Sequence, residues 1–371
     1  MRIIIIGGGI LGTAHAFEAI RRGHQVVHLE REAEARGATV RNFGLVWVSG
    51  RTAGELDIAL RARELWDEIG ETVPGVGFRA NGSLTLLRTP AEVAVAEETV
   101  GRADATTRGF ALLDAEQARA LNPALRGKFL AALHCARDAA VESRQAMPAL
   151  RAHLAASGRY EFVPGVEARA VTTAGIRDDR GRHYEGDQVI ICPGAAHGGL
   201  VRELVGELPV RRVRLQMMQT APLDEPLTTS IADGDSLRYY PGYAGTALDS
   251  LNRIQPQDVV AELHHMQLLC VQRLDGGLTI GDTHEYREPF PFDVTEGPYD
   301  YLVGLVEELL GRALPPVERR WAGVYSQCTD PDAVVCRRTP VDGIHIVTGP
   351  GGRGMTLGPA IAEQTAELIG L

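Results

Sequence analysis

The opening of the chain constrains its fold more than any other segment. Residues 3–6 are four consecutive isoleucines, and a continuous apolar run of this kind is typical of a strand buried on both faces. Gly7, Gly9 and Gly12 follow with the spacing G-x-G-x-x-G, and a helical pattern leads to a second apolar segment, QVVHLE, which ends at Glu30. Strand, motif, helix, strand and acid together predict a βαβ unit of a Rossmann-like α/β domain.

Each glycine of this motif has its own physical role. Gly7 permits the tight turn, Gly9 lets the backbone approach a pyrophosphate, and Gly12 lets the helix pack closely on the sheet. The N-terminus of the helix then faces the phosphates. Glu30 is placed to accept hydrogen bonds from a ribose hydroxyl and would repel a 2′-phosphate, which disfavours NADP. The unit therefore predicts a site for an ADP-containing dinucleotide.

Composition argues against several other classes of function. The 371 residues carry a net charge of −10, whereas a protein that binds nucleic acid needs a basic surface. The five cysteines form no CxxC pair, so we expect neither a disulfide framework nor a metal site. No apolar run approaches the roughly 18 residues of a membrane helix, and the first strand leaves no room for a signal peptide. We therefore expect a cytoplasmic protein without a membrane span.

Two later segments bear on which dinucleotide binds. DQVIICPGAA reads as a buried strand followed by a tight turn at Pro193 and Gly194. Near the end of the chain, a strand over residues 344–348 runs into the glycine-rich segment TGPGGRGMTLG and an amphipathic helix. Such a loop directs N–H groups and a helix N-terminus at its neighbour, which suits the negative charge of a reduced flavin. An NAD site needs no such element, so FAD is favoured. Flavoenzymes reduced by NADPH usually carry a second glycine-rich nucleotide site, and this sequence has none, so we expect electrons to enter from an organic substrate.

In this order and spacing, the three segments resemble the D-amino-acid oxidase superfamily of FAD-dependent oxidoreductases, which includes the glycine and sarcosine oxidases. The resemblance covers essentially the whole chain. It implies an α/β fold, with a FAD-binding Rossmann-like domain of the glutathione-reductase type and a second, mostly antiparallel β-sheet domain for substrate. We expect the FAD-binding domain to comprise residues 1–77, 142–205 and 321–371, and the substrate domain to comprise residues 78–141 and 206–320.

Most segments of the predicted substrate domain read as strands. They are GSLTLLRT, RRVRLQMMQTAP, DSLRYYPGY and AELHHMQLLCVQRLDGGLTIGDTHEY, the last with LDGG as its hairpin turn. Two helices are also expected, one near residues 296–311 and one opened by Asp114, for which Gln117 completes a capping box. His264 and His265, if they lie on a strand, face opposite sides, and no third ligand has metal-binding spacing.

The resemblance also implies where FAD is held. Val166 falls at a backbone contact to adenine, and the C-terminal loop falls around the pyrimidine edge of the flavin. Some sarcosine oxidases attach flavin to a cysteine at a position that is Gly323 here, so we expect non-covalent FAD, with Cys328 close by in sequence. The expected FAD-binding residues are Gly7, Gly9, Ile10, Leu11, Gly12, Glu30, Arg31, Thr39, Arg41, Asn42, Phe43, Val166, Pro193, Gly194, Gly349, Gly352, Arg353, Gly354, Met355 and Thr356.

The same resemblance implies the reaction class. A hydride leaves a carbon that bears a neutral amine, and the imine product hydrolyses in water. Glycine and D-amino-acid oxidases grip the α-carboxylate with an arginine near the end of the substrate domain, but WAGVYS places Tyr325 there. RNFG, IGDTHEY and GGRGMTLG resemble a branch associated with phosphonate breakdown. We therefore expect a small amine with an anionic tail, either an aminophosphonate such as 2-aminoethylphosphonate or its N-methyl form, or an amino acid.

Several residues are candidates for binding or converting this substrate. His284, flanked by Asp282 and Glu285, is a candidate general base because an unperturbed histidine titrates near pH ~6.5, and Tyr325 is the other candidate catalytic residue. Arg41 could reach either the FAD phosphates or the anion of the substrate, and the sequence leaves that choice open. The candidate substrate-binding residues are Arg41, Arg238, Tyr240 and Arg353.

Two alternative functions stay open at this point. The chain could be an FAD-dependent 2-hydroxy-acid dehydrogenase, which needs a strong base and a carboxylate clamp, or a non-catalytic flavin-bearing subunit of a complex. The expected partners are a small-molecule amine and either O2 or another electron acceptor. The sequence does not distinguish an oxidase from a dehydrogenase, and it does not specify the oligomeric state.

Overall fold

The isoleucine run forms the centre of a six-stranded sheet. In the computed structural model, which describes residues 1–371, β1 pairs in parallel with β2 on one side and β12 on the other. The strand order is β18-β19-β12-β1-β2-β8, and only the β18–β19 pair is antiparallel. The strands are β1 (Arg2–Ile6), β2 (Gln25–Glu30), β8 (Tyr160–Pro164), β12 (Gln188–Ile191), β18 (Cys336–Val341) and β19 (Ile344–Thr348). The predicted βαβ unit is therefore confirmed.

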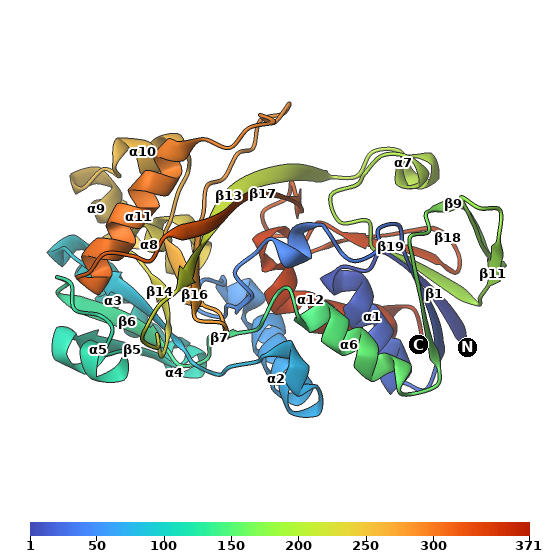
Figure 1. Ribbon diagram of the computed structural model, residues 1–371, viewed down its shortest axis with the longest axis horizontal. Helices are drawn as coiled ribbons and strands as arrows, with labels where there is room; N and C mark the ends of the chain where they lie inside the picture. The colour runs from blue at the N-terminus through green and yellow to red at the C-terminus, as the bar shows by residue number, and fades with distance from the viewer.

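Both faces of this sheet are covered, which explains why β1 carries an unbroken apolar run. Ile3 and Ile5 pack against helices α1, α2 and α12, whereas Ile4 packs against a three-stranded antiparallel meander and α7. Figure 1 shows α1, α6 and α12 together on one side and the meander at the far end. These elements are α1 (Ile10–Arg21), α2 (Leu56–Thr72), α6 (Ala146–Ala155), α7 (Leu200–Val205), α12 (Gly354–Leu368), β9 (Ala168–Thr172), β10 (Gly175–Asp178) and β11 (His183–Glu185).

A second sheet of eight strands builds the other half of the molecule. Its order is β17-β13-β16-β15-β14-β4-β6-β5, and every neighbouring pair is antiparallel except β14–β4. The expectation of a mostly antiparallel second sheet is confirmed. The strands are β4 (Ser83–Leu87), β5 (Phe110–Asp114), β6 (Ala131–Cys135), β13 (Val210–Pro222), β14 (Ser230–Ala232), β15 (Leu269–Gln272), β16 (Gly277–Gly281) and β17 (Val317–Cys328). A short ladder, β3 (Leu45–Val46) with β7 (Ala139–Ala140), lies apart from both sheets.

Helices of the second half cover both faces of this sheet: α5, α10 and α11 pack on one face, with α11 contributing most to that core, and α3, α8 and α9 pack on the other. The α-helices are α3 (Pro90–Val100), α4 (Ala105–Arg108), α5 (Ala115–Leu121), α8 (Asp235–Tyr239), α9 (Thr246–Ile254), α10 (Val259–Leu263) and α11 (Glu296–Leu310). Short 3-10 helices occupy Ala38–Val40, Ala53–Glu55, Pro74–Val76, Pro241–Tyr243 and Gly351–Arg353. The capping box of Asp114 and Gln117 opens α5, and LDGG forms the turn between β15 and β16, as predicted.

Two predictions in this half are wrong. The segment DSLRYYPGY forms α8 and a 3-10 turn rather than a strand. His264 and His265 follow α10, with His265 in the left-handed backbone region, so they do not lie on a strand. In addition, β17 runs as one strand of the large sheet across residue 321, the point at which the sequence-based division placed a domain boundary.

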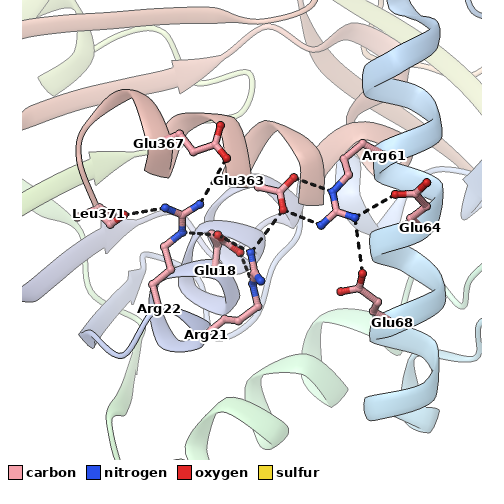
Figure 2. A network of polar contacts seen from close by, with 9 residues as sticks. All are labelled: Glu18, Arg21, Arg22, Arg61, Glu64, Glu68, Glu363, Glu367 and Leu371. Carbon is pink, nitrogen blue, oxygen red and sulfur yellow. Dashed lines mark hydrogen bonds and ion pairs between the residues drawn. The ribbon is translucent and has the colours of Figure 1, made fainter.

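A network of ion pairs joins α1, α2 and α12, which pack on the same face of the six-stranded sheet (Figure 2). Glu363 of α12 accepts hydrogen bonds from Nε and Nη2 of Arg61 of α2, at 2.9 and 2.8 Å, and lies 3.4 Å from Arg21 of α1. On the same helix, Glu367 is far more exposed and lies 3.9 Å from Arg22. Arg61 therefore links α2 to α12 through a two-point contact that is partly shielded from water.

Replacing Glu363 with glutamine should destabilise the protein by about 1–2 kcal/mol at neutral pH, because a partly buried charge-assisted contact is lost. The hydrogen bond from Arg61 lowers the pKa of Glu363. A lowered folded-state pKa means that the stabilisation is present above the unfolded pKa and is lost as the pH falls through the folded one. The difference in melting temperature between wild type and Glu363→Gln should therefore shrink below about pH 4. Glu367→Gln is the matched control, and a drop as large as that of Glu363→Gln would refute the assignment.

Candidate active site

One large cavity lies where the carboxyl ends of β1, β2 and β12 meet the eight-stranded sheet. Its volume is about 1080 Å³, larger than the ~300–1,000 Å³ of pockets for single small ligands. Ligands of open α/β sheets bind at this end of the strands. The predicted cofactor-binding residues that line it are Gly7, Gly9, Ile10, Leu11, Gly12, Glu30, Arg31, Thr39, Arg41, Asn42, Phe43, Val166, Pro193, Gly194, Gly352, Arg353, Gly354, Met355 and Thr356.

Gly349 is the one predicted cofactor-binding residue that does not line this cavity. A Cβ atom on Gly349 would lie 2.9 Å from Val210 and 3.0 Å from the sulfur of Cys328. Its φ of +79° lets the chain turn from β19 into the glycine-rich loop. Gly349 therefore packs against Val210 and Cys328, and the residues that follow it line the cavity.

The glycine motif leaves no room for side chains between the loop and the sheet. A Cβ on Gly12 would lie 1.8 Å from the carbonyl oxygen of Gly7, and a Cβ on Gly7 would lie 2.2 Å from the carbonyl oxygen of Cys192. Gly7 also has a φ of +109°. The motif therefore presents backbone and a helix N-terminus to the cavity, which is the surface that a pyrophosphate requires.

Glu30 occupies the end of β2 at the wall of this cavity. Its carboxylate accepts hydrogen bonds from the backbone N–H of Gly8 at 2.6 Å and of Glu32 at 3.0 Å. These two contacts fix the carboxylate beside the glycine loop. A carboxylate has further lone pairs, so the position remains suitable for the predicted ribose contact.

The segment RNFG is held in shape mainly by its own asparagine. The amide of Asn42 donates to the carbonyl oxygens of Ala38 and Thr39 at 2.9 and 2.8 Å, and its oxygen accepts from the N–H of Gly44 at 2.6 Å. All the hydrogen bonds of the Asn42 side chain are therefore made within the loop, where they fix the backbone conformation beside the cavity. Arg41 is exposed and donates to the carbonyl oxygen of Ala322 on β17 at 2.8 Å.

Two of the predicted substrate-binding arginines, Arg353 and Arg238, differ in their position relative to the cavity. Arg353 lines the cavity, but its guanidinium pairs with Glu55 and donates to the carbonyl oxygens of Pro350 and Ala333. Arg238 lies outside the cavity, where it pairs with Asp235 at 3.0 Å and bonds to groups near the end of α9. The structure therefore brings Arg41, Tyr240 and Arg353 together at the cavity wall, but not Arg238.

The two predicted catalytic residues both line the cavity. Tyr325, on β17, is buried, and its hydroxyl has no hydrogen-bond partner in the chain. That hydroxyl lies 4.0 Å from the point where a Cβ on Gly352 would sit, which places it beside the glycine-rich loop. His284 is buried, and its ring stacks on that of Tyr239 with centroids 4.3 Å apart. The ring of Tyr239 also contacts that of Tyr240, at a centroid distance of 5.1 Å.

Sequence reasoning missed Arg51, which is the buried arginine of the cavity lining. Only 6% of its surface is exposed. Its Nε donates to the carbonyl oxygen of Trp47 at 3.0 Å, and its guanidinium carbon lies 5.8 Å from the centre of the Tyr240 ring. It forms no ion pair, and burial lowers the pKa of Arg51. In sequence it follows a short apolar run like any surface arginine, so no local signal set it apart.

A buried carboxylate fixes the segment that carries Arg51. Asp138 accepts from the backbone N–H groups of Val48 and Ser49 at 2.6 and 3.0 Å and from the hydroxyls of Ser49 and Ser83 at 2.7 and 2.6 Å. Burial raises the pKa of Asp138, and the four donors oppose that effect. Because Ser83 begins β4, this carboxylate ties the segment before Arg51 to the large sheet.

Asp282, at the end of β16, was noted only as a neighbour of His284. It lines the cavity and is 4% exposed. Its carboxylate Oδ2 lies 3.6 Å from Nε2 of His284, and no arginine pairs with it. Burial raises the pKa of Asp282. Of the buried charged side chains in the cavity lining, Glu55 pairs with Arg353, whereas Arg51 and Asp282 form no ion pair with an arginine, aspartate or glutamate.

Two further structural findings concern the chain as a whole. No group of three or more histidine, cysteine, aspartate or glutamate side chains is arranged to hold a metal ion. None of the helices combines the length and the apolar character needed to cross a membrane.

The geometry agrees with comparisons to known proteins. The DAO family model, described as "FAD dependent oxidoreductase", matches residues 2–368. Glycine oxidase of Pseudomonas aeruginosa is 25% identical over 99% of this chain and 94% of its own length. The mitochondrial pyruvate dehydrogenase phosphatase regulatory subunit of Mus musculus is 24% identical over 99% of this chain, which spans only 41% of that protein. The crystal structure of L-proline dehydrogenase from P. horikoshii superposes with a TM-score of 0.80 at 21% identity, covering 99% of this chain and 92% of that one.

Proposed function

We propose that this chain, which belongs to the FAD-dependent oxidoreductase family, oxidises a C–N bond of a small amine that carries an anionic tail. Membership makes it an FAD-dependent amine or amino-acid oxidoreductase. The observation that supports the narrower substrate class is the presence in the cavity of Arg51 and Asp282, two buried charges that form no ion pair with an arginine, aspartate or glutamate. A zwitterion with an ammonium group and an anionic group would neutralise both.

Burial without a partner makes these charges informative. Taking an isolated charge out of water costs several kcal/mol, and chains normally pair or expose such groups. Tyr240 lies near both charges. The guanidinium of Arg51 lies over its ring. Burial raises the pKa of Tyr240; the negative charge of Asp282 adds to this shift and the positive charge of Arg51 opposes it. A single small molecule that contacts Tyr240 would therefore lie within reach of both charges.

Different residues of the cavity wall would contact the cofactor and the substrate. Bound FAD supplies the acceptor for a hydride from the carbon beside the nitrogen. The glycine motif and the helix N-terminus at Gly354 would hold the cofactor, together with the loop that the Asn42 side chain shapes in the same cavity wall. Arg51 anchors the anionic tail, because both of its terminal amino groups are free of partners in the chain. Gly323 lines the cavity, in keeping with non-covalent FAD.

We propose an aminophosphonate as the first substrate to test, 2-aminoethylphosphonate or its N-methyl form, with an amino acid as the alternative. Three points support it: the motifs RNFG, IGDTHEY and GGRGMTLG, the presence of Tyr325 on β17 where an arginine would grip a carboxylate, and the unpartnered hydroxyl of that tyrosine. A phosphonate dianion gains from several separate donors, and a guanidinium with a tyrosine hydroxyl provides them.

The test is anaerobic bleaching of the FAD-loaded protein. We expect 2-aminoethylphosphonate or its N-methyl form to bleach the visible flavin absorption faster than glycine or sarcosine does. If glycine or sarcosine bleaches it faster, the substrate is an amino acid. Bleaching by 2-hydroxyglutarate alone would replace the proposal with C–OH oxidation, and no bleaching at all would favour a non-catalytic flavin-bearing subunit. Admitting air afterwards shows whether O2 reoxidises the flavin, which separates an oxidase from a dehydrogenase.

A further inference from the structure

The surroundings of Asp282 differ from those of an ordinary buried carboxylate. It lies at the end of β16, in the cavity wall, among aromatic rings rather than among cations. His284 is 3.6 Å away, and its ring is stacked with those of Tyr239 and Tyr286, whose centroids lie 4.3 and 6.4 Å from it. Asp282 therefore has a buried negative charge and no permanent cation to balance it.

Both ring nitrogens of His284 lie close to polar groups of the chain. Its Nδ1 lies 3.0 Å from the carbonyl oxygen of His265, and a carbonyl can only accept, so Nδ1 carries the hydrogen. Its Nε2 faces the Asp282 carboxylate. Asp282 also lines the cavity, and its carboxylate forms no ion pair with an arginine. The predicted general-base role fits Asp282 better than His284.

We propose that Asp282 and the aromatic side chains around it form the subsite for the substrate's ammonium group, and that the Asp282 carboxylate takes one proton from that group. In this step one N–H bond breaks, one O–H bond forms on Asp282, and both charges are neutralised. The proposal rests on the proposed function, since oxidation of the C–N bond requires a neutral amine whose lone pair can stabilise the developing C=N bond. An alkylammonium ion in water holds its proton up to pH ~10, as lysine does, so a local acceptor is needed.

The aromatic rings suit the same ligand. Cations bind over the faces of tyrosine and tryptophan rings, and cages of such rings recognise alkylated ammonium groups. Tyr239, Tyr286 and Tyr325 all lie near enough to Asp282 for its charge to contribute to raising their pKa values. One carboxylate among aromatic faces satisfies the one or two N–H donors of an alkylated ammonium better than the three donors of a primary one. The subsite therefore favours N-alkylated amines.

The pH dependence follows from the groups that face Asp282. Burial raises the pKa of Asp282, with the nearby His284 opposing the shift. The carboxylate accepts a proton only when it is ionised, so flavin reduction in the wild type should rise as the pH passes its pKa and then level off. The facing titratable groups are His284 in the same loop, Tyr286 just after it, Tyr239 at the end of α8, Tyr240 directly after that helix, and Tyr325 of β17.

Binding of an amine that cannot be oxidised tests the subsite separately from the reaction. tert-Butylammonium has no hydrogen on the carbon beside its nitrogen, and tert-butanol is its neutral counterpart. Titrated into the FAD-loaded protein and followed by the flavin spectrum, tert-butylammonium should bind at least about tenfold more tightly than tert-butanol in the wild type. Asp282→Asn should remove that preference. Equal binding of the two probes to the wild type would overturn the proposal without any variant.

The reaction step is tested with whichever amine bleaches the flavin. Asp282→Asn should slow bleaching at pH 7 by about 100-fold, as expected for loss of a general base, and should recover towards pH ~10 where the free amine predominates. Asp233→Asn is the matched control, because Asp233 is also a buried carboxylate with its pKa raised, to about 7, but it lies outside the cavity. It should keep the wild-type pH profile.

The outcomes separate this proposal from the proposed function. If no amine bleaches the flavin, yet tert-butylammonium binds preferentially and Asp282→Asn abolishes the preference, the proposed function fails and the subsite stands. If amines bleach the flavin while Asp282→Asn keeps the wild-type rate, pH profile and probe preference, the subsite is refuted and the proposed function stands.

Discussion

Replacing Arg51 with methionine should raise the KM for the zwitterionic substrate by about 100-fold or more, while FAD stays bound. Arg51 is the buried cation of the cavity and is free of ion pairs. Truncating one member of a buried charge pair costs roughly 2–5 kcal/mol, and each ~1.4 kcal/mol is a factor of ten in affinity. Methionine fills a similar volume without a charge, so the fold should tolerate it. Bleaching rates over a range of substrate concentrations give the KM, and the flavin-to-protein absorbance ratio reports the FAD content.

The informative comparison is Arg41→Met. Arg41 is exposed at the edge of the same cavity and bonds to a backbone carbonyl of β17, and an exposed charge contributes only ~0–1 kcal/mol. We expect a change of no more than about fivefold in KM for this variant. If Arg41→Met shows the larger loss and Arg51→Met leaves the KM unchanged, the anionic tail is held at the loop rather than beside Tyr240. A variant of Arg51 that loses FAD instead would place this arginine in the cofactor site.

The cofactor half of the fold was predictable because its determinants are local. A strand buried on both faces needs an unbroken apolar run, and residues 3–6 supply it. Gly12 permits a helix–sheet distance that no other residue allows, so its presence at that spacing carries structural information by itself. The strand at residues 344–348 was likewise recognisable from its sequence, because the glycine loop that follows it marks its end.

The substrate half was less predictable because tertiary contacts override local preference there. The tyrosines of DSLRYYPGY favour a strand by propensity, yet Leu237 is fully buried and the segment forms α8. The same applies to the charges. Arg238 and Arg51 are both arginines next to apolar residues, and only the packing of the chain shows that the first pairs with Asp235 outside the cavity while the second faces into it. Asp282 gains its significance from the absence of a cation nearby, which a sequence cannot display.

Gly12→Val should yield a folded protein that has lost FAD. A Cβ at this position would lie 1.8 Å from the carbonyl oxygen of Gly7 and 3.1 Å from Nε2 of His28, which itself contacts that carbonyl at 2.9 Å. The N-terminus of α1 must therefore move away from the glycine loop, and the N–H groups that face the phosphates move with it. Losing two charge-assisted hydrogen bonds costs about 3–6 kcal/mol, or at least about 100-fold in affinity. Fluorescence titration of the apo-protein with FAD measures this directly.

Gly37→Ala provides the matched control for that titration, because Gly37 lines the same cavity and a Cβ there would meet no atom within 4 Å. Its FAD affinity should remain within a few-fold of wild type, which corresponds to less than ~1 kcal/mol. Circular dichroism should show that Gly12→Val keeps its secondary structure, since the eight-stranded sheet has its own core. If Gly12→Val binds FAD as tightly as Gly37→Ala does, the phosphates do not lie at this helix N-terminus. The cofactor would then have to occupy the cavity in a different orientation, with its anionic part towards the loop before α12, where Gly352 and Gly354 also leave the backbone open.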